Sequence, residues 1–238
     1  MQSSRRLWFT AAAVVALVAG GATPQAGAVQ LSQAEIIIEI NATDGDAGIQ
    51  VFLDGEDWTR MKVFDPDGNK VLDIRATGSV GIQGVTELFF ESAEPSFDEQ
   101  PLAEFLALFP EGTYRFLGTT TDGRPLRGRA ELTHALPDGP VLVAPVDGDD
   151  EVDPEGTVIE WQLVADPPGS SIVGYQVIVE REEPSLLVFS ADIGPTTTSV
   201  TVPPEFMLPG TAYKYEVLAI EEGGNQTLSE AEFETAED

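Results

Sequence analysis

The chain contains no cysteine and a single histidine, His134, among its 238 residues. Without cysteine, no disulfide can stabilise the fold and no thiol is available for chemistry. One histidine cannot supply the usual ligands of a zinc site. A Ser-His-Asp hydrolase would depend on His134, and no Gly-x-Ser-x-Gly motif accompanies it. These absences favour a non-catalytic protein with neither zinc nor thiol chemistry.

Basic residues are also scarce, because 12 lysines and arginines stand against 41 aspartates and glutamates, for a formal charge of −29. Electrostatic repulsion makes nucleic acid and anionic membrane surfaces poor partners for such a chain. Solubility alone explains a strongly acidic surface. Calcium or a cationic partner is the alternative explanation of the charge.

The first residues have the pattern of a targeting signal. Arg5 and Arg6 precede an apolar run at residues 7–20, and residues 26–28 are the small residues of a signal-peptidase site. We therefore predict a signal peptide at residues 1–28, read either by the general secretory route or by the twin-arginine route. Because the run is shorter than a membrane span, we expect an exported bacterial protein, periplasmic or extracellular, with no stable span after cleavage.

The last hundred residues carry the clearest fold signal. A Pro-Gly turn at residues 209–210 leads into a strand whose Tyr213, Tyr215 and Val217 share one face at a period of two. Strands with Trp161 and Tyr175 lie upstream, and seven strands can be counted from residue 141 onward. This pattern resembles a fibronectin type III domain. The resemblance implies a β-sandwich at residues 137–238, but no particular ligand, because unrelated binding proteins share this scaffold.

One sequence pattern of the second half also occurs in the first half. Residues 109–116, like residues 208–215, place Pro, Gly and Thr before an aromatic strand, here carrying Tyr114. We expect each Tyr hydroxyl to anchor a corner between sheets, as in immunoglobulin-like sandwiches. Residues 29–136 are therefore predicted to form an immunoglobulin-like β-sandwich. A jelly roll of the proprotein-convertase P-domain kind is the alternative.

One short helix is predicted to interrupt this first sandwich at residues 98–109. Ser96 and Glu99 have the spacing of a capping box, and Phe105 and Phe109 belong to an apolar stripe at helical spacing. We expect both rings in the core. The predicted fold class is thus all-β, with two consecutive β-sandwiches and one inserted helix, preceded by a signal peptide. The Pro-rich junction near residues 136–140 should restrict how the two halves move.

Two sets of candidate binding residues stand out. Hard cations such as calcium take carboxylate and carbonyl oxygens from loops, and two acidic turns offer them, although neither matches an EF-hand. The calcium candidates are Asp44, Asp46, Asp147, Asp149, Glu151 and Asp153. Trp58 lies in a polar, loop-like stretch and is the candidate for an exposed sugar-binding platform.

The sequence predicts no enzyme and no required cofactor, with calcium as an option. We expect an exported protein that mediates protein–protein interaction or adhesion at the cell envelope. The alternative is a polysaccharide-binding accessory module that binds glycan through Trp58. A small secreted hydrolase is a third hypothesis, and it would require a cleft with converging carboxylates.

Overall fold

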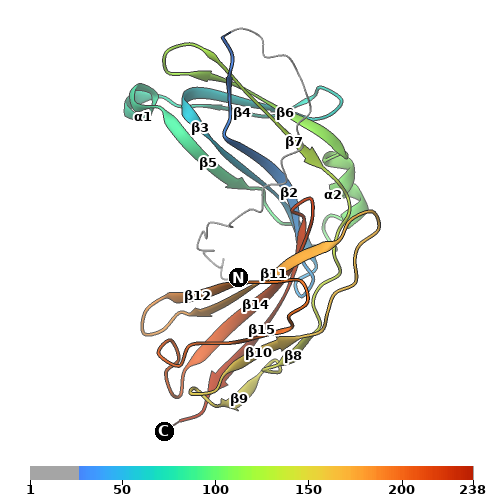
Figure 1. The fold of residues 1–238 in the computed structure, drawn as a ribbon, viewed down its shortest axis with the longest axis vertical. Coiled ribbons are helices and arrows are strands. Elements are labelled where there is room, and N and C mark those ends of the chain that lie inside the picture. Colours follow the sequence, from blue (N-terminus) through green and yellow to red (C-terminus); the bar gives the residue numbers. More distant parts are fainter. Residues whose placement is uncertain (1–26, 238) are drawn as a thin grey trace.

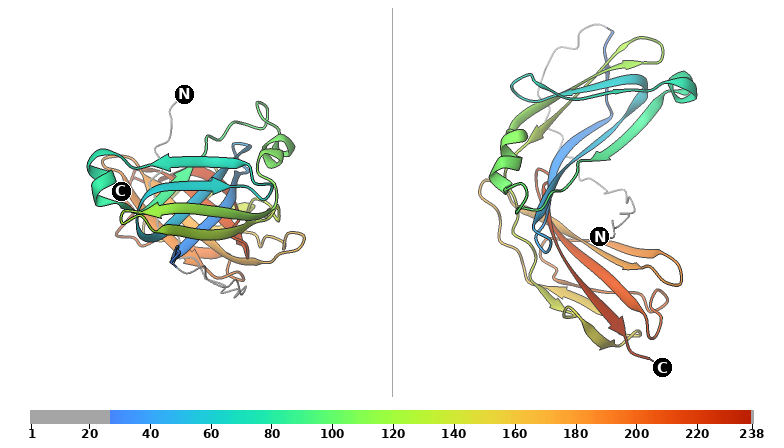
Figure 2. Two further views of the ribbon diagram at one scale, coloured as in Figure 1. Left: turned by 90° about the horizontal axis from the view of Figure 1, so that it is seen from above. Right: turned by 180° about the vertical axis from the view of Figure 1, so that it is seen from behind.

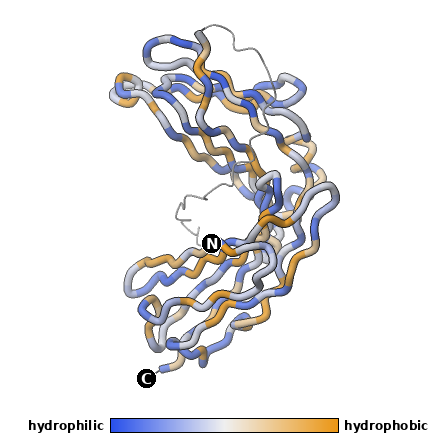
Figure 3. Tube along the Cα trace, in the orientation of Figure 1, coloured by the Kyte–Doolittle hydropathy of each residue, from blue (hydrophilic) through white to orange (hydrophobic). Residues whose placement is uncertain are grey.

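A computed structural model describes residues 27–237, which form 15 β-strands and two short helices. The strands make two sandwiches that lie end to end and bend towards one side (Figures 1 and 2). Hydrophobic and hydrophilic residues alternate along the strands of both sandwiches (Figure 3), as expected for sheets with one buried face. Within the described range, no helix is both long and apolar enough to cross a bilayer. The predicted signal peptide, except for its last two residues, lies outside the described residues.

The first sandwich is organised around one long strand that belongs to both of its sheets. Its strands are β1 (Val29–Gln30), β2 (Gln33–Asn41), β3 (Asp46–Phe64), β4 (Lys70–Arg75), β5 (Val85–Glu91), β6 (Gly112–Thr120) and β7 (Pro125–Leu132). The first half of β3 lies between β2 and β5, and its second half lies between β4 and β6. β6 pairs with β7, and β7 pairs in parallel with β1. This arrangement is an immunoglobulin-like sandwich, as predicted.

The sequence suggested a polar, loop-like stretch at Trp58, and that interpretation was wrong. β3 is continuous, with register shifts between Asp54 and Trp58 and again between Trp58 and Arg60. Each shift changes which residues face inward, so the buried positions pass from Leu53 to Trp58 and then to Met61. The two irregularities break the period of two, which is why the segment resembles a loop in the sequence.

The helix of the first sandwich, α2 (Leu102–Leu108), lies within the predicted range, but its start differs from the prediction. Its N-cap is Pro101, with no side-chain capping bond, so the predicted capping box does not form. Ser96 instead bridges to Asp46. Phe105 is buried and Phe109 packs against the same core, as predicted. A second helix, α1 (Gly78–Gln83), was not predicted because it buries no residue and so leaves no apolar stripe.

The second sandwich has the strand arrangement of a fibronectin type III domain. Its strands are β8 (Leu142–Ala144), β9 (Asp149–Val152), β10 (Val158–Trp161), β11 (Ile172–Arg181), β12 (Leu187–Ile193), β13 (Ser199–Thr201), β14 (Ala212–Glu221) and β15 (Gln226–Thr235). One sheet has the order β13-β10-β8, and the facing layer has the order β9-β15-β14-β11-β12. Seven strands correspond to the expected ones. The eighth, β9, lies in the acidic segment expected to be a loop.

Only one of the two tyrosine corners forms. In the second sandwich the Tyr213 hydroxyl accepts a hydrogen bond from the Leu208 amide at 2.7 Å, as predicted. In the first, the Tyr114 hydroxyl is buried without a hydrogen-bond partner, so the predicted corner is wrong. The equivalent amide, of Phe109, already donates to the Leu106 carbonyl at the end of α2. Burial, with the nearby Asp65 and Asp67, raises the pKa of Tyr114 to about 12.

This asymmetry predicts opposite results for one substitution at the two sites. Tyr213→Phe should lower the free energy of unfolding by about 1–2 kcal/mol, because it leaves the Leu208 amide unpaired. Tyr114→Phe should change it by less than about 0.5 kcal/mol, because a hydroxyl without a partner contributes no bond that can be lost. Urea denaturation of both variants checks this, and equal losses would contradict the asymmetry.

The two sandwiches share one sheet. The end of β2 pairs in parallel with the start of β15, with Glu39 opposite Gln226 and Asn41 opposite Leu228. The pairing joins strands of both sandwiches into a 12-stranded sheet. The buried Asn225 adds hydrogen bonds to Ile38 and Thr133 of the first sandwich. Backbone pairing and buried side-chain bonds thus fix how the two halves meet.

Candidate functional site

Trp58 is not a surface residue. The prediction of an exposed indole was wrong, because Trp58 is fully buried where β3 passes from one sheet to the other, paired with Val85 and Thr120. Trp161 is also buried, against Tyr175, with ring centroids 5.3 Å apart. Neither indole offers a face on which a sugar ring could stack.

His134 follows β7, and two hydrogen bonds join it to residues of its own sandwich. Its amide donates to Glu111 Oε1 at 2.6 Å, and its ring Nε2 lies 2.8 Å from the Phe109 carbonyl oxygen. These bonds join the end of β7 to the segment that follows α2. The contacts account for His134 as a structural residue.

The six calcium candidates do not converge. Asp44 and Asp46 lie at the turn between β2 and β3, while the other four lie around β9. Three of those four accept backbone amides: Asp147 from Glu232 at 3.1 Å, Asp149 from Val146 at 2.8 Å, and Asp153 from Glu155 at 2.9 Å. Among the described residues, no three of the six bring carboxylate oxygens within reach of one ion. The bonded carboxylates stabilise turns, as is common for Asp.

The carboxylates that do meet are Glu39, Glu91 and Glu94, whose oxygens lie within 4.8 Å of one another. β2 and β5 flank β3, which brings Glu39 and Glu91 to the same region. Gly48 makes room for Glu94, since a Cβ there would lie 2.9 Å from Glu94 Cγ. Gln226 donates to Glu39 at 2.5 Å, and all three glutamates make further interactions. Sequence reasoning missed this cluster because only strand pairing brings its members together.

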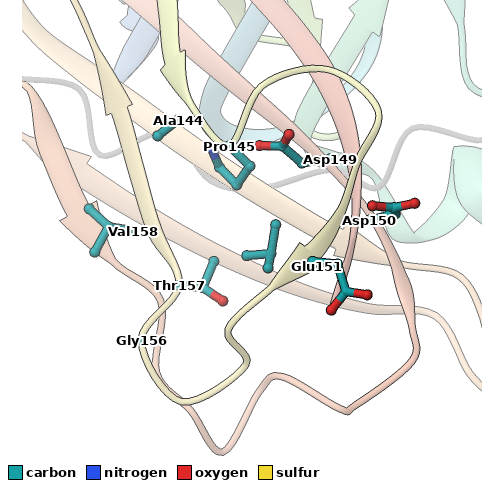
Figure 4. A pocket seen from close by; sticks show the side chains of 9 residues that line it. Ala144, Pro145, Asp149, Asp150, Glu151, Gly156, Thr157 and Val158 are labelled. Atoms are coloured by element: carbon teal, nitrogen blue, oxygen red, sulfur yellow. The ribbon is translucent and has the colours of Figure 1, made fainter. Parts of the chain in front are cut away.

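A half-open pocket of about 370 Å³ lies at the end of the second sandwich, between β8, β9 and β10. Its volume is at the lower end of the range of about 300–1,000 Å³ that is usual for small-ligand sites. Its walls combine apolar and acidic residues: Ala144, Pro145, Val152, Val158, Thr157, Gly156, Asp149, Asp150 and Glu151. Figure 4 shows Val158 on one side of this pocket and Asp150 and Glu151 on the other.

A buried tyrosine forms a hydrogen bond with one residue of the pocket wall. The Tyr215 hydroxyl donates to the Pro145 carbonyl at 2.6 Å and so fixes the end of β8. Burial raises the pKa of Tyr215, and the charges of Asp147 and Asp149 raise it further. The phenol therefore stays neutral and keeps donating at neutral pH.

The surroundings of the pocket are strongly acidic. Residues 137–238 contain 22 acidic residues and only two basic ones, Arg181 and Lys214. Arg181 is buried. Lys214 Nζ lies 2.7 Å from Glu230 and 3.4 Å from Glu216. Burial lowers the pKa of Lys214, but these two carboxylates outweigh burial and raise it overall. Both basic side chains are therefore held within the sandwich or by its own carboxylates.

The arrangement of the strands is that of a tandem β-sandwich protein with a fibronectin type III-like fold. No family model matches the chain. Solved structures that match it include fibronectin(III)-like modules of CbhA from Clostridium thermocellum, at 8% identity and TM-score 0.36, covering 87% of this chain and 93% of that one. A two-domain fibronectin type III segment of chicken tenascin matches at 11% identity and TM-score 0.31, covering 86% and 99%. The FN1–FN3 domains of chicken CNTN1 match at 12% identity and TM-score 0.37, covering 88% and 65%.

Proposed function

We propose that this is an exported, non-catalytic bacterial protein that binds another protein at the cell envelope, in the periplasm or outside the cell. In this proposal residues 1–28 are removed on export, and residues 29–136 and 137–238 are the two structural units. The observation that carries the proposal is the surface of the second sandwich, where an open pocket combines exposed carboxylates with apolar walls. Such mixed surfaces suit protein recognition, in which an apolar centre provides contact and charges at the rim provide specificity.

The joint between the sandwiches supports the same function. Pairing of β2 with β15 and the buried bonds of Asn225 hold both halves in one orientation. A partner that contacts both halves then binds a preorganised surface and does not have to order a flexible linker.

The two other hypotheses, glycan binding and hydrolysis, each depend on particular residues. A polysaccharide-binding module was predicted from an exposed Trp58, and Trp58 is buried. A small secreted hydrolase would require a cleft with converging carboxylates, and the glutamates that do converge, Glu39, Glu91 and Glu94, do not line the pocket between β8, β9 and β10.

A cross-linking pull-down from the native cell envelope, with residues 29–238 as bait, tests the proposal. We expect one protein partner in stoichiometric amount, retained in preference to an unrelated acidic bait of similar charge. Recovery of polysaccharide alone, or of no protein above the acidic control, would contradict the proposed function.

A further inference from the structure

We propose that the pocket between β8, β9 and β10 binds a lysine or arginine side chain that a partner protein presents. This inference rests on the proposed function and names the chemistry of the partner at one site. The residues that line the pocket fit such a side chain without a calcium ion or a sugar.

The apolar walls fit the stem of such a side chain. Pro145 is buried, Ala144 and Val152 are half-buried, and Val158 on β10 lies across the pocket from Asp150 and Glu151 (Figure 4). Lysine and arginine carry an aliphatic stem that packs against apolar surface while the charged end stays at the rim. A small metal ion would leave these apolar walls without a contact.

The acidic rim fits the charged end. Asp149, Asp150 and Glu151 are consecutive on β9 and exposed. All three line the pocket, and a register shift of β9 against β15 between Asp149 and Val152 interrupts the regular alternation of their side chains. The Val146 amide fixes the Asp149 carboxylate by donating to its Oδ2 at 2.8 Å, and Figure 4 shows this carboxylate beside Pro145. The rim therefore holds preoriented negative charge beside an apolar wall.

The negative charge of the protein indicates whether the pocket would bind a second copy of this chain or a different protein. A second copy would bring 41 acidic residues against 10 basic ones within residues 29–238. Repulsion between two such surfaces opposes self-association, whereas a cationic segment is attracted. The complementary partner is therefore a different protein with a basic segment.

Exposed valines extend the surface beyond the pocket. Val141, Val143 and Val146 are 56%, 40% and 61% exposed, and all lie along or beside β8. Val146 follows Pro145 directly in the chain, whereas Val143 lies on the face of β8 opposite to Ala144. The segment that fits this surface thus has apolar residues next to its lysine or arginine.

The test uses the blocked pentapeptide Gly-Val-Lys-Val-Gly as the probe and nuclear magnetic resonance of residues 29–238 as the readout. We expect saturable shifts of amide signals in residues 144–158. The same peptide with an Nε-acetylated lysine keeps the stem and loses the charge, and should produce no saturable shifts. Asp149→Asn with Glu151→Gln should weaken binding about fivefold to tenfold, because two rim charges are lost while Asn can still accept the Val146 amide.

The matched control is Glu182→Gln with Glu183→Gln, which removes the same charge from an exposed part of the second sandwich outside the pocket. We expect less than a twofold change for this control. Equal weakening by both variants, or equal binding of the acetylated peptide, would overturn the inference. A cell-envelope partner captured equally by wild type and pocket variant would overturn it while leaving the proposed function intact. If the probe binds as expected but no partner is captured, the pocket chemistry is supported and the proposed function fails.

Discussion

Replacing Trp58 by alanine should lower the free energy of unfolding of the first sandwich by about 3–5 kcal/mol, the usual cost of truncating a buried tryptophan. The indole is fully buried at the point where β3 leaves one sheet and joins the other. The cavity would therefore open between the two layers, where both β5 and β6 depend on the same strand. Urea denaturation followed by circular dichroism measures the loss.

Two further variants separate packing from other effects of Trp58. Trp58→Phe keeps an aromatic ring and removes the indole Nε1, which is buried without a hydrogen-bond partner, so its cost should be well below that of Trp58→Ala. Leu117→Ala, at a position 37% exposed on β6, is the matched truncation and should cost less than about 1 kcal/mol. A Trp58→Ala protein as stable as wild type would show that the indole is outside the core and would restore the sugar-binding hypothesis.

The second sandwich could be predicted from the sequence because its local patterns agree with its fold. Tyr213, Tyr215 and Val217 are every second residue of β14 and so lie on one face, and all three are buried. The Pro-Gly turn before them leads into the tyrosine corner, which forms as predicted. β9 was missed because a strand of mainly acidic residues carries no hydrophobic alternation, and only its pairing with β15 defines it.

The first sandwich was predictable in class and less so in detail. Two irregularities in β3 reverse the inward face around Trp58, so alternation could not show that the segment is one strand. The tyrosine corner at Tyr114 failed because α2 uses the Phe109 amide. The first error comes from a change of strand register and the second from the use of one backbone amide by α2, and local sequence patterns record neither.

The candidate sites were harder to predict than the fold. The acidic residues of β9 were noted from the sequence, but the apolar wall that they face comes from β8 and β10. The cluster of Glu39, Glu91 and Glu94 similarly depends on strands that are distant in the sequence. Contacts of this kind follow from pairing and register, which are specified by the whole sheet.

Replacing Asn225 by alanine should lower the free energy of unfolding by about 2–4 kcal/mol, because the side chain links both halves of the protein. Its Oδ1 accepts the Ile38 amide at 2.9 Å, and its Nδ2 donates to the Thr133 carbonyl at 3.0 Å and to the Ala135 carbonyl at 3.4 Å. Asn225 is 1% exposed, so water cannot easily replace these bonds in the folded protein. Urea denaturation measures the loss, and faster proteolysis at residues 133–141 should accompany it.

Asn225→Asp tests whether the donor side of the amide holds the joint. The substitution keeps an oxygen for the Ile38 amide but turns a carboxylate towards the Thr133 and Ala135 carbonyls, so charge burial and repulsion add to the lost bonds. It should destabilise the protein at least as much as Asn225→Ala at neutral pH, and less at acidic pH, where the carboxyl is protonated and can donate. Asn69→Ala, at an exposed turn where the amide donates to Asp65, is the matched control and should cost less than about 1 kcal/mol. If Asn225→Asp were as stable as wild type, the donor bonds would not hold the sandwiches together, and the joint would depend on β2–β15 pairing and on the other side-chain bonds across it.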